Sequence, residues 1–320
     1  MSNFSTVLSS RHQILALGGG GYRGLYSAAF LESCEEFFNT KCKEKFDLIA
    51  GTSIGALLAT GLSLGIPAKD LKSAMLEHGP RIFKQKCLVS LERLILRAPY
   101  ETKSLRNAIE DVIGKDAALM PLNELDAPLL ISTVNYTTGR AVILESGGIA
   151  GQAATQIPIV DAILASAAAP TFFPLKKIGT DQFADGGLVA NAPDMVALTS
   201  QIATKRAMLE DMYMLSIGTA GRRNGAAVHP VALNPSIFSW LFFRGLVQTT
   251  MAAQEDMALT QASALLGDRH LRIDCEPAQN QVASIASMDR ADVGATDTLI
   301  SLASTTFNDF KTTRNLRAFF

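Results

Sequence analysis

Three short motifs in this chain of 320 residues carry side chains that can act together on an ester. They are the glycine run of residues 18–24, the segment 51–55 with Ser53 between two glycines, and Asp185 followed by two more glycines. A serine hydroxyl can attack a carbonyl carbon and a carboxylate can accept its proton. Converging backbone N–H groups can hold the resulting oxyanion. The motifs are therefore the components of a nucleophilic hydrolase site.

Ser53 lies between an apolar run that predicts a strand, residues 46–50, and a small-residue run that predicts a helix, residues 56–65. A nucleophilic serine projects from a sharp, strained strand-to-helix turn, where Gly51 and Gly55 remove Cβ atoms that would clash. The helix N-terminus also favours negative charge on the serine oxygen. The alternative is that Ser53 only caps the helix. Together with a glycine loop on the neighbouring strand, the pattern favours the nucleophile.

The glycine run GGGGYRG also fits the dinucleotide-binding pattern, with Gly19, Gly21 and Gly24 in the required places after a predicted strand. That pattern needs an acidic residue about 20 residues later, at the end of the second strand, to bind a ribose. The chain has Gly51-Thr52-Ser53 there, so the match is incomplete. Consecutive glycines before a helix also form an oxyanion hole, or simply a tight turn. A non-enzymatic nucleotide-binding module stays as an alternative.

The proton acceptor for Ser53 has two kinds of candidate. His229 and His270 follow the serine as histidines do in α/β-hydrolases, but neither lies in a recognisable local motif. Asp185 follows a short predicted strand, and its glycine neighbours leave the carboxylate unobstructed. A carboxylate is a weak base, so a Ser–Asp pair needs a short contact and partial desolvation. Asp-Gly-Gly is otherwise a hairpin turn.

The three motifs need strands and helices to position them, and the pattern of apolar residues predicts where these strands and helices lie. Predicted strands cover residues 13–17, 46–50, 129–136, 140–144, 182–184 and 212–217. Predicted helices cover residues 25–38, 56–65, 159–169, 194–209 and 292–310. This alternation predicts an α/β fold with a mostly parallel sheet covered on both faces. We expect one domain over residues 1–320, with core motifs in 12–220 and a helical C-terminal part in 230–320.

The composition excludes several classes of function. A formal net charge of −1 gives no general attraction to a nucleic acid polymer. The four cysteines have no zinc-ligand spacing, so no metal or other cofactor is expected, and they are typical of reduced thiols in a cytoplasmic protein. The N-terminus has no signal-peptide pattern, and no apolar stretch is long enough to span a bilayer.

The three motifs, together with ASAAAPTFFP at residues 165–174, resemble the patatin-like phospholipase family. The resemblance covers residues 12–220 well and the tail weakly, and it departs at Gly18, where many relatives have Asp. It implies a three-layer α/β/α sandwich and a metal-free Ser–Asp dyad. The roles implied are Ser53 as nucleophile, Asp185 as proton acceptor, Gly20 and Gly21 as oxyanion hole, Gly19, Arg23 and Gly24 as its supporting loop, and Gly51, Gly55, Gly186 and Gly187 as motif glycines.

Within that family, the compact chain is similar to bacterial effectors of the cyclic-oligonucleotide antiphage systems called CBASS. This resemblance implies activation by a cyclic dinucleotide and degradation of membrane phospholipid at the inner face of the membrane. It is also compatible with assembly into a homo-oligomer on activation. Arg222 and Arg223 are candidates for contact with ligand phosphates. Residues 237–247, which include Trp240, are a candidate for membrane contact, for the acyl pocket or for a core helix. The alternative is a constitutive patatin-like esterase or thioesterase.

Overall fold

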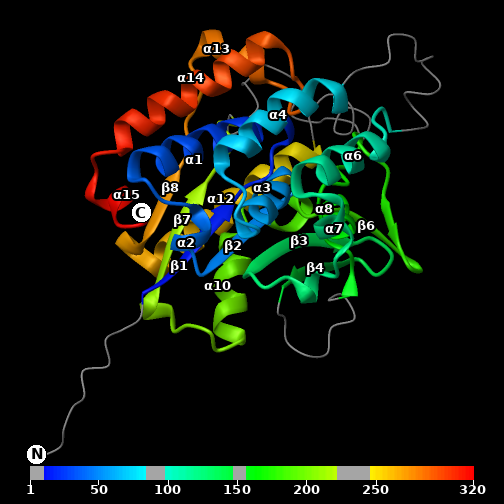
Figure 1. Ribbon diagram of the computed structural model, residues 1–320, viewed down its shortest axis with the longest axis horizontal. Helices are drawn as coiled ribbons and strands as arrows, with labels where there is room; N and C mark the ends of the chain where they lie inside the picture. The colour runs from blue at the N-terminus through cyan, green and yellow to red at the C-terminus, as the bar shows by residue number, and fades with distance from the viewer. Residues whose placement is uncertain (1–10, 84–97, 147–155, 222–245) are drawn as a thin grey trace, which may run out of the picture.

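The computed structural model describes residues 11–83, 98–146, 156–221 and 246–320, and within them it shows an eight-stranded sheet between two layers of helices (Figure 1). The strand order is β5-β6-β3-β2-β1-β7-β8, and β4 also pairs with β3. The bounds are β1 His12–Leu17, β2 Leu48–Thr52, β3 Leu129–Asn135, β4 Arg140–Glu145, β5 Lys176–Ile178, β6 Asp181–Asp185, β7 Met212–Ile217 and β8 His270–Ile273. Strands β3, β2, β1, β7 and β8 are parallel, whereas β4, β5 and β6 join through antiparallel pairings.

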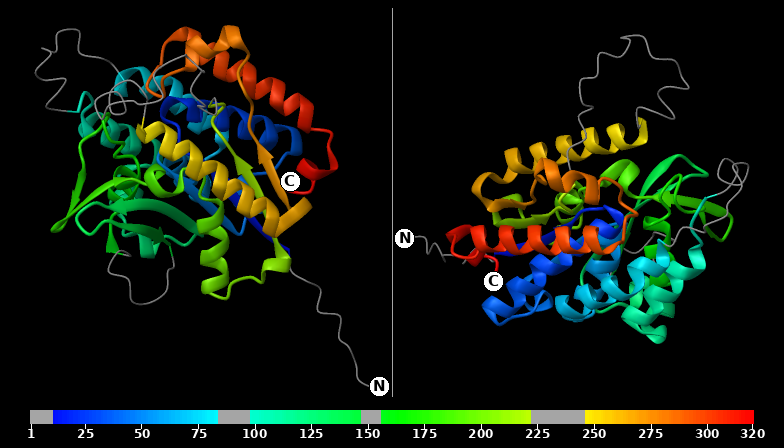
Figure 2. Two further views of the ribbon diagram at one scale, coloured as in Figure 1. Left: turned by 180° about the vertical axis from the view of Figure 1, so that it is seen from behind. Right: turned by 90° about the horizontal axis from the view of Figure 1, so that it is seen from above.

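The helices lie on both faces of this sheet, which confirms the predicted three-layer α/β/α architecture. Figure 2 (right) shows α12 on one side of the sheet and α1, α4 and α6 on the other. The main helices are α1 Gly24–Phe38, α3 Ile54–Ser63, α4 Ala68–Ile82, α6 Thr102–Ile113, α8 Ile159–Ser166, α10 Asp194–Ala203, α12 Leu246–Leu266, α13 Gln279–Ile285 and α14 Val293–Phe310. The shorter ones are α2 Cys42–Lys45, α7 Lys115–Leu119, α9 Gly187–Ala190 and α15 Arg314–Arg317.

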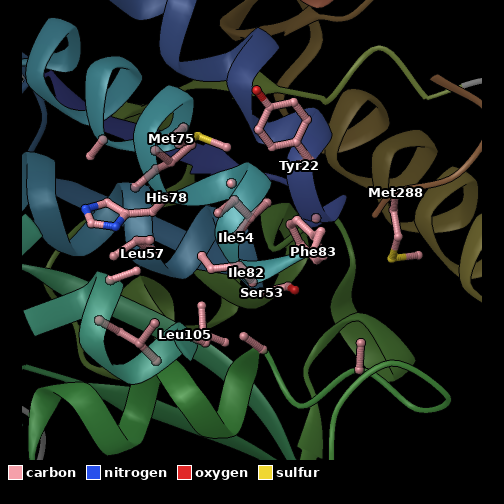
Figure 3. Close-up of a pocket in the computed structure, with 18 of the residues that line it drawn as sticks. Tyr22, Ser53, Ile54, Leu57, Met75, His78, Ile82, Phe83, Leu105 and Met288 are labelled. Atoms are coloured by element: carbon pink, nitrogen blue, oxygen red, sulfur yellow. The ribbon is translucent and has the colours of Figure 1, made fainter. Parts of the chain in front are cut away.

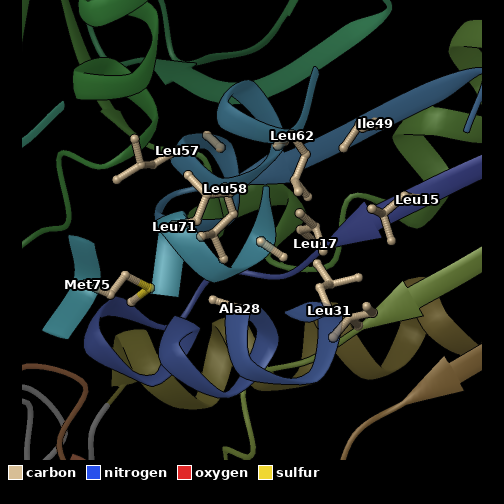
Figure 4. Close-up of a cluster of buried hydrophobic side chains, with 14 of the residues drawn as sticks. Leu15, Leu17, Ala28, Leu31, Ile49, Leu57, Leu58, Leu62, Leu71 and Met75 are labelled. Carbon is tan, nitrogen blue, oxygen red and sulfur yellow. The ribbon is translucent and has the colours of Figure 1, made fainter. Parts of the chain in front are cut away.

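Successive side chains of the central strands point to opposite faces of the sheet and so divide the hydrophobic core into two clusters. Leu15 and Leu17 of β1 pack into the larger cluster with α1, α3 and α4, part of which Figure 4 shows. Ile14 and Ala16 of the same strand pack into the smaller cluster with α10 and α12. Successive side chains of a strand point to opposite faces, so a strand buried on both faces is apolar throughout. This is why β1 is recognisable from sequence as a short apolar run.

Strands β5 and β8 are not among the predicted strands, and α12 is predicted only as an undivided part of the helical segment 230–320. Strand β5 is only three residues long, and β8 carries His270 and Arg272 between its apolar residues, so neither has a continuous apolar run. Helix α12 carries apolar side chains around its circumference, exposing Met257 while burying Leu259, so it lacks one clear apolar stripe. The predicted helix 194–209 ends at Ala203, near Lys205, whose φ of 57° is incompatible with a continuing helix.

Candidate active site

The glycine run and the serine turn lie side by side at one edge of the sheet. They follow β1 and β2, which are parallel neighbours with Leu17 opposite Gly51. The carboxyl ends of parallel strands meet at the same edge of a sheet, which is where ligand sites form in open α/β sheets. The predicted proximity of these two motifs is therefore present in the structure.

Strand β3 brings the third motif to the same place. Its residue Ser132 lies opposite Thr52 of β2, and the next residue, Thr133, lies opposite Asp185 of β6. Strand β4 occupies the other edge of β3. Strands β2 and β6 thus pair with consecutive segments of β3 on the same side of that strand, and we call this shared side the β3 edge. As a result, the residue after Thr52, which is Ser53, lies beside Asp185.

The turn at Ser53 has the strained geometry that a projecting serine needs. Its φ of 56° and ψ of −120° lie outside the regions that non-glycine residues favour. A Cβ atom on Gly51 would overlap the carbonyl oxygen of Gly55, and one on Gly55 would overlap that of Leu17. Although Ser53 occupies the N-cap position of α3, its side chain makes no capping hydrogen bond. The capping alternative is thus not realised, and the hydroxyl is available for other contacts.

The glycine loop offers unpaired backbone donors next to Ser53. A Cβ atom on Gly19 would lie 3.4 Å from Cβ of Ser53. The N–H of Gly19 donates to the carbonyl of Asn191 at 3.0 Å, whereas the N–H groups of Gly20 and Gly21 have no acceptor among the described residues. Gly20 lines a polar cavity at Ser53, and Gly21 lines an apolar pocket there. Two free donors beside a serine fit the geometry of an oxyanion hole.

Asp185 is a buried carboxylate with a perturbed pKa. It is 3% exposed, and its Oδ1 accepts a hydrogen bond from the N–H of Gly187 at 2.7 Å. Burial raises the pKa of Asp185 to about 6, although the hydrogen bonds from Gly187 and from the Ser53 hydroxyl lower it. Desolvation disfavours the charged form of a carboxylic acid, so burial makes Asp185 a stronger base than an exposed aspartate. This is the desolvation that a Ser–Asp pair requires.

Ser166, at the end of α8, supports both motifs, and sequence reasoning gave it no role. Its Oγ accepts the N–H of Ser53 at 2.8 Å, and its carbonyl accepts the N–H of Gly186 at 3.1 Å. Two residues further on, the carbonyl of Ala168 accepts the N–H of Asp185 at 3.0 Å. This segment therefore fixes the serine turn and the aspartate turn relative to each other. Its only sequence signal is its place in the ASAAAPTFFP segment.

Two cavities of different character meet at Ser53. The larger, the polar cavity of about 410 Å³, has apolar walls as well as the charged side chains after which we name it, and it reaches from Gly20 and Asp185 toward charged residues of α12 and β8. The smaller, of about 70 Å³, is apolar and lies among α3, α4 and α6 (Figure 3). Its lining side chains include Leu57, Leu58, Met75, Ile82, Phe83, Leu105, Phe172 and Phe173. The serine thus stands between a polar space and an apolar one.

Arg23 and Gly24, at the end of the glycine run, have different surroundings. Gly24 permits α1 to approach Ile54 closely, because a Cβ atom there would lie 2.6 Å from a side-chain carbon of Ile54. Arg23 lines the polar cavity, and its buried Nε has no hydrogen-bond partner among the described residues. Burial lowers the pKa of its guanidinium, and the negative charges of Asp274 and Glu255 partly offset that effect.

The alternative base His270 is directed elsewhere. Its Nε2 pairs with Oδ1 of the buried Asp194 at 2.9 Å, its Nδ1 contacts the Ser263 hydroxyl at 2.7 Å, and it lines neither cavity. His229 lies outside the described residues, as do Arg222, Arg223 and most of the segment 237–247. Only the end of that segment is described: Leu246 begins α12, and Val247 lines the polar cavity.

The α/β/α fold, with a serine in a strained strand-to-helix turn beside a glycine loop and a buried carboxylate, fits a hydrolase that uses a serine nucleophile. The family model described as patatin-like phospholipase matches residues 15–198, more than half of the chain. The chain therefore belongs to the patatin-like phospholipase family. Within the part of the chain that the structure describes, no helix is both long and apolar enough to cross a bilayer.

Three curated relatives cover most of the chain, and each bears the name cGAMP-activated phospholipase. The protein of Pseudomonas aeruginosa (strain BWHPSA011 / Pa011) is 35% identical over 90% of this chain and 85% of its own length. That of Escherichia coli (strain TW11681) is 32% identical over 91% of this chain and 87% of its own. That of Vibrio cholerae serotype O1 is 31% identical over 78% of this chain and 76% of its own.

Proposed function

We propose that Ser53 and Asp185 form the catalytic dyad of a phospholipase that releases fatty acids from membrane phospholipid. The observation that carries this proposal is their adjacent placement on one edge of β3, at the point where the two cavities meet. Ser53 attacks the ester carbonyl while Asp185 accepts its proton and passes it to the leaving alcohol. The N–H groups of Gly20 and Gly21 hold the oxyanion, each contributing about 3 kcal/mol. Asp185 then activates water, which releases the fatty acid.

The two cavities orient the substrate in this proposal. The fatty acyl chain enters the apolar pocket beyond Leu57 and Phe83, while the glycerol phosphate and head group occupy the polar cavity. Two arginines line the polar cavity: Arg272 pairs with Glu255 and Asp274, whereas Arg23 makes no ion pair among the described residues, so Arg23 is the cation placed to meet the phosphate. Hydrogen bonds from a guanidinium to phosphate oxygens are short and strong, so this contact orients the phosphate.

The pH profile follows from the pKa of Asp185. The carboxylate must be ionised to accept a proton, so kcat/KM should rise with pH through an apparent pKa near 6 and level off above it. An exposed aspartate would give a rise near pH 4. The measurement is the initial rate on a soluble, uncharged ester from pH 4 to 9, with Ser53→Ala as blank. A profile that is flat between pH 5 and 7 contradicts the assignment of Asp185 as base.

We further propose that a cyclic dinucleotide activates this phospholipase, and that it serves antiphage defence at the inner face of the membrane. Activation is supported by three relatives at 31–35% identity, each of which bears the name cGAMP-activated phospholipase. The proposed defence role rests on the resemblance of the sequence to CBASS effectors. The test is fatty-acid release from vesicles of phosphatidylethanolamine and phosphatidylglycerol, with wild type and Ser53→Ala, across a panel of cyclic dinucleotides that includes cGAMP. We expect release only with wild type and one nucleotide.

Two other outcomes of this assay separate the alternatives. Release that depends on Ser53 but is the same with every nucleotide makes the protein a constitutive lipid acyl hydrolase. Hydrolysis of soluble esters or thioesters with no release from vesicles makes it an esterase or thioesterase. Labelling of Ser53 by a fluorophosphonate distinguishes all of these enzymes from a nucleotide-binding module, which gives no label.

A further inference from the structure

The loop between α13 and α14 contributes a methionine to the boundary between the two cavities. Met288 is one of four described residues, with Ser53, Ala169 and Phe172, that line both of them. In Figure 3, Met288 extends from the C-terminal part of the chain, on the side of the pocket away from His78. An ester bound at Ser53 has its first acyl carbons at this boundary. The Met288 side chain is therefore a wall of the entrance to the apolar pocket.

The backbone of this loop is held firmly against the glycine loop. The carbonyl of Met288 accepts the N–H of Tyr22 at 2.7 Å, and a Cβ atom on Gly21 would overlap that carbonyl. The next residue, Asp289, accepts a hydrogen bond from the Tyr100 hydroxyl at 2.6 Å. The anchoring contacts come from the backbone and from Asp289. A change of the Met288 side chain thus alters the wall while leaving the loop attached.

The apolar pocket is small for a phospholipid acyl chain. Its volume of about 70 Å³ is below the roughly 150 Å³ of an engineered apolar cavity that holds benzene. Ring contacts hold the phenylalanines of its wall in place: the ring centroids of Phe83 and Phe173 are 6.3 Å apart, and Phe172 stacks at 6.4 Å on Tyr100, which does not line the pocket. Methionine, by contrast, has three rotatable bonds and adapts its shape to what it contacts. Among the residues at this entrance, Met288 has the side chain that can change conformation, and it can thereby open or block the passage into the pocket.

We infer that Met288 determines which acyl chains the enzyme accepts, by setting the width of the passage from Ser53 into the apolar pocket. This inference rests on the proposed function, since it assumes that acyl esters react at Ser53. One extra or missing methylene of a substrate in an apolar pocket changes discrimination about 10- to 200-fold. Shortening Met288 should favour long chains over short ones, and a bulky rigid side chain should do the opposite.

The experiment compares kcat/KM for 4-nitrophenyl decanoate and 4-nitrophenyl butanoate, with the activating cyclic dinucleotide present if wild type requires it. In Met288→Ala, the decanoate-to-butanoate ratio should rise about tenfold, and in Met288→Phe it should fall by a similar factor. The ratio is informative because a general loss of folded protein lowers both rates equally. A thermal melt of each variant checks that the fold is retained.

Met257→Ala is the matched control. Met257, on α12, is exposed and lines neither cavity, so the same truncation there should leave the ratio unchanged. An unchanged ratio in both Met288 variants overturns the inference, and so does an equal shift in Met257→Ala. If wild type shows no hydrolysis of butanoate beyond that of Ser53→Ala, the proposed function fails, and this result is distinct from a failure of the inference.

Discussion

Replacing Ser53 with alanine should abolish fatty-acid release, with a fall in kcat on the order of 10⁴- to 10⁶-fold, because no other hydroxyl in the site takes over the attack. The folded structure should survive. The Ser53 hydroxyl caps no helix, and alanine at φ 56° carries the same backbone strain as serine. The measurement is release of free fatty acid from vesicles, together with a thermal melt to show that the variant remains folded.

Ser53→Gly separates chemistry from strain at this position. Glycine adopts positive φ without a steric penalty, so this variant should be as inactive as Ser53→Ala but more stable, by up to about 1–3 kcal/mol of relieved strain. A variant that lacks the hydroxyl and retains more than a tenth of wild-type activity would falsify the nucleophile assignment. An unchanged melting temperature in Ser53→Gly would show that the turn stores little strain.

Asp185→Asn should lower kcat by about 10³- to 10⁴-fold without loosening the site. The amide has nearly the same shape as the carboxylate, and its oxygen can still accept the N–H of Gly187. It cannot accept a proton from Ser53. The measurement is the steady-state rate on a soluble ester at pH 8, where wild type is fully ionised. Near-normal activity at that pH would show that another group is the base.

The same substitution should stabilise the protein by an amount that increases with pH. The pKa of Asp185 is about 6 in the folded chain, against about 4 unfolded, so between these values the folded state binds more protons. Its contribution to stability therefore falls as pH rises from about 4 to 6, by about 3 kcal/mol in all. Asp185→Asn avoids this loss, so the free energy of unfolding of the variant should exceed that of wild type by an amount that grows over this pH range. An advantage that shrinks with rising pH would contradict the cause assigned to the pKa.

Much of this site is predictable from local sequence, because each motif has its own turn chemistry. A serine between two glycines, as Ser53 lies between Gly51 and Gly55, predicts a strained turn where a strand meets a helix. The apolar runs of β1 and β2 predict that this turn lies at the carboxyl ends of the central strands. The proximity of Asp185 is another matter, since 132 positions separate it from Ser53 (185 minus 53). Their meeting depends on the register of β3, which no local pattern encodes.

Other parts of the site could not be predicted, for physical reasons. Ser166 supports the site through a single hydroxyl and a carbonyl, contacts that a serine can make in many folds. Met288 reaches the site only through the packing of α13 and α14, and its segment carries no motif. Strand β8 interrupts its apolar residues with His270, which pairs with the buried Asp194, and with Arg272, which pairs with the partly exposed Asp274. In each case a tertiary contact decides the role of the residue, and the spacing of residue types does not.

The sharing of one β3 edge by β2 and β6 has a consequence for how the protein loses activity. Interior strands of a sheet open only when the whole cooperative unit unfolds, whereas surface segments open at much lower free energy. Separating Ser53 from Asp185 requires pulling a strand away from β3. We therefore expect the backbone around the proposed dyad to stay in place until the sheet unfolds, so that heat inactivation coincides with global unfolding. We also expect changes of shape that regulate the enzyme to occur in its outer segments, over a site whose backbone is as durable as the fold itself.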